Sequence, residues 1–138
     1  MAGRERRPGA RLAIFAAAAA GCAGPSYSAY PLDLPGGVPA HAFAVCRDAL
    51  AARFGALVTV DAAAFLLQTD WVACADLPGE RRASVFRQID GAVAGLGVVV
   101  EVRRLTEPLL GLPRWTAPRG DAAAERELAD LLRAAINP

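Results

Sequence analysis

The sequence predicts an α+β domain in which a helix, a four-stranded and mostly antiparallel sheet, and a C-terminal helix follow one another, with both helices on one face of the sheet. Two segments, 40–54 and 122–136, repeat apolar residues every three or four positions, which is typical of amphipathic helices. Between them, short segments alternate apolar and polar residues, as strands do when one face is buried. A run of strands between two helices favours an antiparallel sheet with one open face.

The first helix is indicated by an apolar stripe. Its members are spaced by three and four residues and are Phe43, Cys46, Leu50 and Phe54. Residues with this spacing share one face of a helix. Gly55 follows, and glycine often comes directly after a helix because it tolerates a left-handed backbone. We expect the helix to end there.

Four strands are expected between the helices, at residues 56–61, 65–73, 82–89 and 98–103. A turn at 61–63 joins the first two strands, and the glycine-rich segment 90–97 is expected to be a loose hairpin connection. In the second strand, Trp71 falls on the same face as Leu67 and Thr69, so we expect it to be tucked over the core. Depending on register, the open face would carry Gln68, Asp70, Arg87 or Gln88, and Glu101 or Arg103.

The C-terminal helix follows a proline-containing loop. Residues 106–120 contain three prolines and are expected to run over the surface. Asp121 is a favoured N-cap, because its carboxylate accepts a hydrogen bond from a free N–H group of the first helical turn. The apolar stripe of this helix consists of Leu128, Leu131, Leu132, Ala135 and Ile136.

The first 21 residues have the composition of a signal peptide. The cationic residues Arg4, Arg6, Arg7 and Arg11 lead into nine apolar residues at 12–20. A membrane-spanning helix needs about 20 apolar residues, so this run is too short to cross a bilayer. The sequence therefore predicts export and removal of residues 1–21.

The segment Ala19-Ala20-Gly21-Cys22 resembles the lipobox of bacterial lipoproteins, a motif that usually has leucine where this chain has Ala19. The resemblance implies that Cys22 is diacylated on sulfur and becomes the first residue of a membrane-anchored protein. Ala23 stands where aspartate would act as an inner-membrane retention signal, so the resemblance implies the outer membrane, on its periplasmic side. The alternative is an ordinary secretory signal cleaved nearby, which would discard Cys22 or leave it as a plain thiol.

The mature chain divides into a tether and one small domain. Residues 22–39 are rich in glycine, proline and serine and are expected to form a flexible lipidated tether, followed by the domain at 40–138. Without the leader, the chain carries 11 arginines and 13 acidic residues. This balance argues against nucleic acid as a partner, because neutralising phosphates requires a clustered basic surface.

Cys46 and Cys74 are the two cysteines that remain beside the anchor. In an oxidising periplasm such a pair is a candidate disulfide. The alternative is two free thiols, since an unpaired cysteine behaves as a small apolar residue. The pair lacks CxxC spacing, so neither a redox motif nor a zinc site is predicted from it.

Other residues that carry chemistry do not form a recognisable constellation. His41 is the single histidine, and no nucleophile or metal-ligand pattern accompanies it. The remaining candidates are carboxylates that suit a solvated sheet face, namely Asp61, Asp70, Asp76, Asp90 and Glu101. We therefore predict no catalytic residues, no cofactor and no metal site.

The residues best suited to contact a partner are Arg114 and Trp115, at the end of the leucine-rich loop 109–115. Tryptophan and arginine are enriched at interface hot spots. An apolar loop of this kind is either folded over the core or displayed to a partner, and the sequence leaves both alternatives open.

These features predict a membrane-anchored cell-envelope lipoprotein that acts as a non-catalytic adaptor or structural component, with another envelope protein as its partner. A lipidated tether followed by a compact helix-and-sheet module is similar in plan to the small accessory lipoproteins of outer-membrane assembly machines. Two alternatives remain, a carrier that holds a lipid or small ligand in an apolar cavity and a small envelope hydrolase that uses paired carboxylates.

Overall fold

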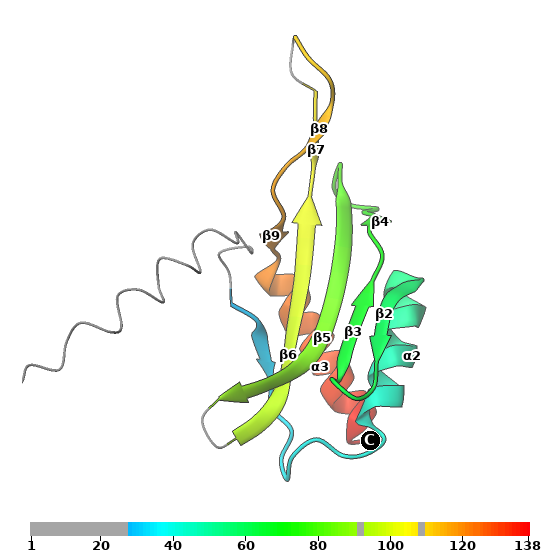
Figure 1. Cartoon of the computed structure of the whole chain (residues 1–138), viewed down its shortest axis with the longest axis vertical. Coiled ribbons are helices and arrows are strands. Elements are labelled where there is room, and N and C mark those ends of the chain that lie inside the picture. The colour runs from blue at the N-terminus through cyan, green and yellow to red at the C-terminus, as the bar shows by residue number, and fades with distance from the viewer. Residues whose placement is uncertain (1–27, 91–92, 108–109) are drawn as a thin grey trace, which may run out of the picture.

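The protein folds as an antiparallel sheet with two helices on one face (Figure 1). The computed structural model describes residues 28–90, 93–107 and 110–138. The helices are α2 (Ala42–Phe54) and α3 (Ala122–Ile136), and the strands are β1 (Tyr30–Leu32), β2 (Leu57–Asp61), β3 (Leu66–Thr69), β4 (Val72–Ala73), β5 (Glu80–Asp90), β6 (Val93–Arg103), β7 (Leu105–Thr106), β8 (Arg114–Trp115) and β9 (Arg119–Gly120). The predicted α+β class is confirmed, but within the described residues the sheet has seven strands rather than four.

The two longest strands, β5 and β6, form an antiparallel ribbon at the centre of the sheet. The strand order is β1-β6-β5-β3-β2, and β4 and β9 pair with β5 and β6 respectively. β7 and β8 form a separate two-stranded ribbon that projects past the end of the sheet (Figure 1). We call residues 105–107 and 110–115 the β7–β8 hairpin.

The core lies between the sheet and the helices. α2 packs on β2, β3 and β5, α3 packs on β1 and β6, and the two helices contact each other. The fully buried side chains include Leu50, Leu67, Val85, Val98, Leu128 and Leu132. Burying one such side chain contributes about 1.5–3 kcal/mol, so this layer is the main apolar contribution to stability.

Both predicted helices are present. α2 begins at Ala42 rather than at 40, and Gly55 follows it with a positive φ of 87°, a backbone conformation that favours glycine. α3 covers the predicted range, and the Asp121 carboxylate accepts a hydrogen bond from the Ala124 N–H, as expected for an N-cap.

The prediction of one long strand at 65–73 is wrong. β3 ends at Thr69, and the Asp70 carboxylate then accepts a hydrogen bond from the N–H of Trp71. A local bond of this kind competes with strand pairing. It interrupts the alternation of faces, and Trp71 therefore lies on the open face of the sheet rather than over the core.

β6 also begins earlier than expected. The segment 90–97, predicted as a loose connection, contains the end of β5 and the start of β6, whose first paired residue is Val93. Gly97 lies within the strand opposite Phe86, where an added Cβ would approach Phe86 Cε2 to 3.0 Å and Gln88 Oε1 to 2.9 Å. The glycine thus makes room for neighbouring side chains rather than forming a turn.

Part of the predicted tether 22–39 belongs to the domain. β1 pairs with β6 at the edge of the sheet, and Leu32 on β1 is 1% exposed. Pro31 is tolerated there because an edge position does not require its missing N–H. The predicted surface loop 106–120 likewise contains β8, β9 and the last residue of β7. Residues 22–27, and with them Cys22, lie outside the described residues.

The pairing register settles which polar residues lie on the open face. They are Gln68, Gln88, Glu101 and Arg103, whereas Arg87 has the opposite orientation and Asp70 lies in the bend after β3. The Gln68 amide donates to the Ser84 hydroxyl across two strands at 3.0 Å. The open face therefore has cross-strand polar contacts.

Candidate functional site

Four side chains on the open face alternate arginine and tryptophan. In order they are Arg82, Trp71, Arg103 and Trp115, and we call them the arginine–tryptophan stack. Arg103 Cζ lies 4.2 Å from the centroid of the Trp71 ring and 4.3 Å from that of Trp115. Arg82 Cζ lies 4.5 Å from the Trp71 centroid. At these distances each cation is attracted to the negative face of the ring.

Each arginine of the stack is paired with a glutamate directly across the β5–β6 ribbon. Glu101 Oε2 accepts from Arg82 Nη2 at 2.6 Å and from Arg82 Nε at 2.7 Å, and the Glu101 side chain is 7% exposed. Glu80 Oε2 accepts from Arg103 Nη2 at 2.6 Å and from Arg103 Nε at 2.9 Å. Such charge-assisted bonds are short and strong. The carboxylates therefore fix the edges of the guanidinium groups while their faces contact the rings.

The stack connects the β7–β8 hairpin to the sheet. At the hairpin base, the Thr116 N–H donates to the Arg104 carbonyl at 2.7 Å, and the Arg104 N–H donates to the Thr116 hydroxyl at 2.9 Å. The next pair joins Leu105 to Trp115, whose ring lies on Arg103. Trp115 remains 43% exposed. The structure thus displays an aromatic ring whose position is set by the sheet below it.

Arg114 and Trp115, which the sequence grouped as one contact, belong to two different surfaces. Successive residues of a strand point to opposite faces, so Arg114 lies on the face of the hairpin away from the stack. There it lines a hollow of about 420 Å³ together with Thr106, Leu110 and Leu112. Both residues are exposed, which favours display over folding onto the core.

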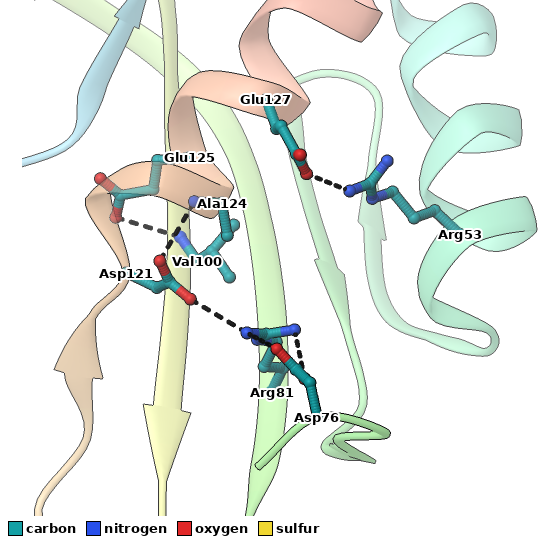
Figure 2. A network of polar contacts seen from close by, with 8 residues as sticks. All are labelled: Arg53, Asp76, Arg81, Val100, Asp121, Ala124, Glu125 and Glu127. Atoms are coloured by element: carbon teal, nitrogen blue, oxygen red, sulfur yellow. Dashed lines mark hydrogen bonds and ion pairs between the residues drawn. The ribbon is translucent and has the colours of Figure 1, made fainter.

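A second polar cluster lies where α3 begins (Figure 2). Arg81 pairs with Asp76 Oδ1 at 3.1 Å and with Asp121 Oδ2 at 3.3 Å. Because Asp121 also caps α3, the Arg81 guanidinium links β5, the loop after β4 and the helix N-terminus. These groups line a cleft of about 480 Å³ that also contains Cys74. Among the described residues Arg81 Nε is buried without a hydrogen-bond partner, but both ion pairs of Arg81 join structural elements, which indicates a structural role.

Glu125 completes the edge of β6 (Figure 2). β1 pairs with β6 only as far as Val98, and β9 pairs with it from Glu101 onward. In the gap, Glu125 Oε1 accepts the Val100 N–H at 3.2 Å, so a side chain replaces a strand carbonyl. Burial raises the pKa of the Glu125 carboxyl above its usual value, although the Val100 hydrogen bond acts in the opposite direction.

Both cysteines are free in the structure, which matches the second of the two sequence alternatives. Cys46 is fully buried on the inner face of α2, and burial raises the pKa of its thiol to about 12. Cys74 is partly exposed, and burial raises the pKa of its thiol, opposed by the cation of Arg81. Neither thiol has the depressed pKa that activates a nucleophilic cysteine.

The other chemistry-bearing residues serve local structure. His41 Nε2 lies 2.9 Å from the Ile136 carbonyl, which ties the start of α2 to the end of α3. The Asp61 carboxylate accepts the Ala64 N–H in the turn after β2. Within the described ranges, no three or more His, Cys, Asp or Glu side chains gather in a way that could hold a metal ion.

The paired glutamates of the stack were missed from the sequence, although a signal was present. β5 contains Glu80 and Arg82 two residues apart, and β6 contains Glu101 and Arg103 in the same arrangement. In an antiparallel ribbon these two patterns place opposite charges across from each other twice. These pairs can be recognised only when the β5–β6 register is known, and the start of β6 was predicted at the wrong residue.

Comparison with protein-family models, with curated proteins and with solved structures finds no match to this chain. No described helix is both long and apolar enough to cross a membrane. The predicted leader and Cys22 precede the described residues, so their role continues to rest on the sequence.

Proposed function

We propose that this protein is a lipid-anchored component of the cell envelope that acts as a non-catalytic adaptor and contacts another envelope protein through the arginine–tryptophan stack. The observation that carries the proposal is the state of Trp115, which is 43% exposed but stacked on a carboxylate-paired arginine. A large ring held in one orientation on a projecting hairpin is suited to enter a pocket of a partner.

The composition of the stack supports this role. Tryptophan and arginine dominate hot spots because they bury a large area and form directional contacts. Arg82 and Arg103 are already paired with Glu101 and Glu80, so a partner that covers them does not have to neutralise an unpaired charge. Because these arginines are already held in one orientation, they lose less conformational entropy when a partner binds.

The lipid anchor completes the proposal. Acylation of Cys22 would hold the domain at the outer membrane, on the periplasmic side, and would keep it at high local concentration near membrane-bound partners. A lipobox-type modification attaches more than one acyl chain, which is what durable anchoring requires.

Site-specific photocrosslinking in the native host tests the contact. A photoreactive residue replaces Leu105, which is 46% exposed and lies opposite Trp115 on the same face of the hairpin. We expect a discrete adduct with one envelope protein, lost when Trp115→Ala is added. The matched control carries the photoreactive residue at Val58, which is 59% exposed on the distant strand β2. Equal adducts from both positions, or an adduct at 105 that survives Trp115→Ala, would contradict the proposal.

A further inference from the structure

We propose that the tip of the β7–β8 hairpin is a second membrane contact, in which Leu110 and Leu112 enter the headgroup region of an anionic bilayer while Arg104, Arg114 and Arg119 contact lipid phosphates. This inference rests on the proposed function, because the lipid anchor brings the domain to a membrane. It assigns the tip to the bilayer and leaves the stack, on the other face of the hairpin, for the protein partner.

The tip is the most exposed apolar feature of the described chain. Leu110 is 97% exposed and Leu112 is 80% exposed, while the other exposed large apolar side chains reach at most 70%. The hairpin that contains these two residues projects past the end of the sheet, away from both helices (Figure 1). Leucines at a projecting apex can enter a bilayer surface without unfolding any other contact.

The hairpin end of the domain carries a net positive charge, whereas the rest of the mature chain carries a net negative charge. Residues 104–120 contain three arginines and one glutamate, whereas the rest of the mature chain contains eight arginines and twelve acidic residues. Among the described residues, Arg104, Arg114 and Arg119 form no ion pair, although most other arginines do. Exposed arginines near an anionic membrane surface each strengthen binding.

The arginines lie beside apolar surface, as contact with lipid requires. Arg114 shares a hollow with Leu110 and Leu112. Arg104 and Arg119 line one cleft of about 590 Å³ at the hairpin base. A lipid phosphate that meets Arg114 therefore also places its acyl chains near the leucines.

The described chain enters the sheet near the end that carries the hairpin. β1 runs antiparallel to β6, with Tyr30 opposite Val98 and Leu32 opposite Leu96, so β1 begins at its end nearer the hairpin. The stretch from Cys22 to Ser28 reaches at most about 20 Å, at roughly 3.3–3.6 Å per residue. An anchor at Cys22 therefore keeps the start of β1 close to the bilayer, and the hairpin must lie tilted against the surface for its tip to touch the lipid.

A bilayer suits the tip better than a folded protein does. A stable protein interface buries about 800 Å² on each partner, far more than two leucine side chains provide. A lipid surface needs no complementary shape, and small apolar groups combined with basic residues suffice for reversible attachment.

The test uses the mature chain, residues 22–138, with Cys22→Ser, so that no acyl chain contributes. Vesicles of phosphatidylethanolamine and phosphatidylglycerol, mixed at roughly 3:1, are sedimented with the protein across a lipid titration. We expect the double variant Leu110→Asp/Leu112→Asp to bind the vesicles at least about tenfold more weakly than the parent chain. Each change removes an inserted apolar side chain and adds repulsion from the anionic lipid. Binding should also weaken in high salt and on pure phosphatidylcholine.

The matched control is Val58→Asp/Val60→Asp, which makes the same chemical change at two valines that are 59% and 53% exposed on β2. It should bind vesicles as the parent chain does. Absence of vesicle binding by the parent chain, or equal binding by the parent and the tip variant, would overturn the inference and leave the tip to a protein partner. Either result is independent of acylation and of the crosslink from position 105, so failure of the proposed function would be recognised separately.

Discussion

The two faces of the central sheet are ordered by different means. On the helix face, side chains such as Leu67, Val85 and Val98 are fully buried under α2 and α3. On the open face the described part of the chain has no helix, yet Glu101 is only 5% exposed because Arg82 and its neighbours cover it.

This difference separates stability from recognition. Apolar burial is non-directional and supplies most of the free energy of folding. Paired charges stacked on rings contribute less net energy, because desolvation opposes their attraction, but they fix orientation. We infer that the helix face holds the fold together and that the open face positions Trp115 for contact.

The sharpest comparison uses neighbouring residues of β3. Leu67→Ala on the helix face should lower the free energy of unfolding by about 2–5 kcal/mol, because it leaves a cavity in a filled core. Leu66→Ala deletes the same atoms on the open face, where the side chain is partly exposed, and should cost about 1 kcal/mol. Denaturant titration followed by circular dichroism measures both values. Equal losses in the free energy of unfolding would show that the two faces of the sheet are buried to the same extent.

The next effect concerns the ion pair on the open face. Glu101→Ala leaves Arg82 without its carboxylate and should lower the free energy of unfolding by about 1–3 kcal/mol, less than for a fully buried pair because water reaches Arg82. Asp48→Ala is the control, since it breaks the exposed Arg47–Asp48 pair and should cost less than about 1 kcal/mol. If both variants lower the free energy of unfolding equally, the Arg82–Glu101 pair behaves like an ordinary exposed ion pair.

The smallest expected effect is a pH dependence at Glu125. Because the pKa of this carboxyl is raised in the folded state, the folded protein binds the proton more tightly than the unfolded chain does. The corresponding stability is present below the usual value of 4.5 and is lost as pH rises through the folded pKa. Glu125→Gln keeps an acceptor for Val100 without the charge, so its stability relative to wild type should increase with pH across this window.

Thermal melts of both proteins between about pH 4 and pH 8 measure the difference. Glu125→Leu serves as the contrast, because it leaves the Val100 N–H without its acceptor and should cost about 1–2 kcal/mol at every pH. A constant difference between wild type and Glu125→Gln would show that the carboxyl titrates alike in both states.

The helices could be predicted from the sequence because their signals are local. The stripe that includes Cys46 and Leu50, the glycine at 55 and the N-cap at Asp121 all lie within or next to the helices they define. Glu125 is not among the apolar residues of the predicted stripe, although its spacing of three from Leu128 places it on the buried face.

The sheet was harder to predict because its signals are not local. The bend at Asp70 depends on one side-chain hydrogen bond, and the edge strand at Tyr30–Leu32 exists only because β6 is there to pair with it. Trp115 was predicted as a contact residue from its residue type and its place in an apolar loop. Its setting on Arg103 follows from the β5–β6 register.

The most direct test of the proposed anchored adaptor is the intact mass and membrane fractionation of the full chain expressed in a bacterial host, compared with Cys22→Ser. The proposal predicts a mature form that begins at Cys22, carries the mass of acyl chains and sediments with membranes, and a Cys22→Ser product that does neither. A soluble wild-type product of unmodified mass would contradict it.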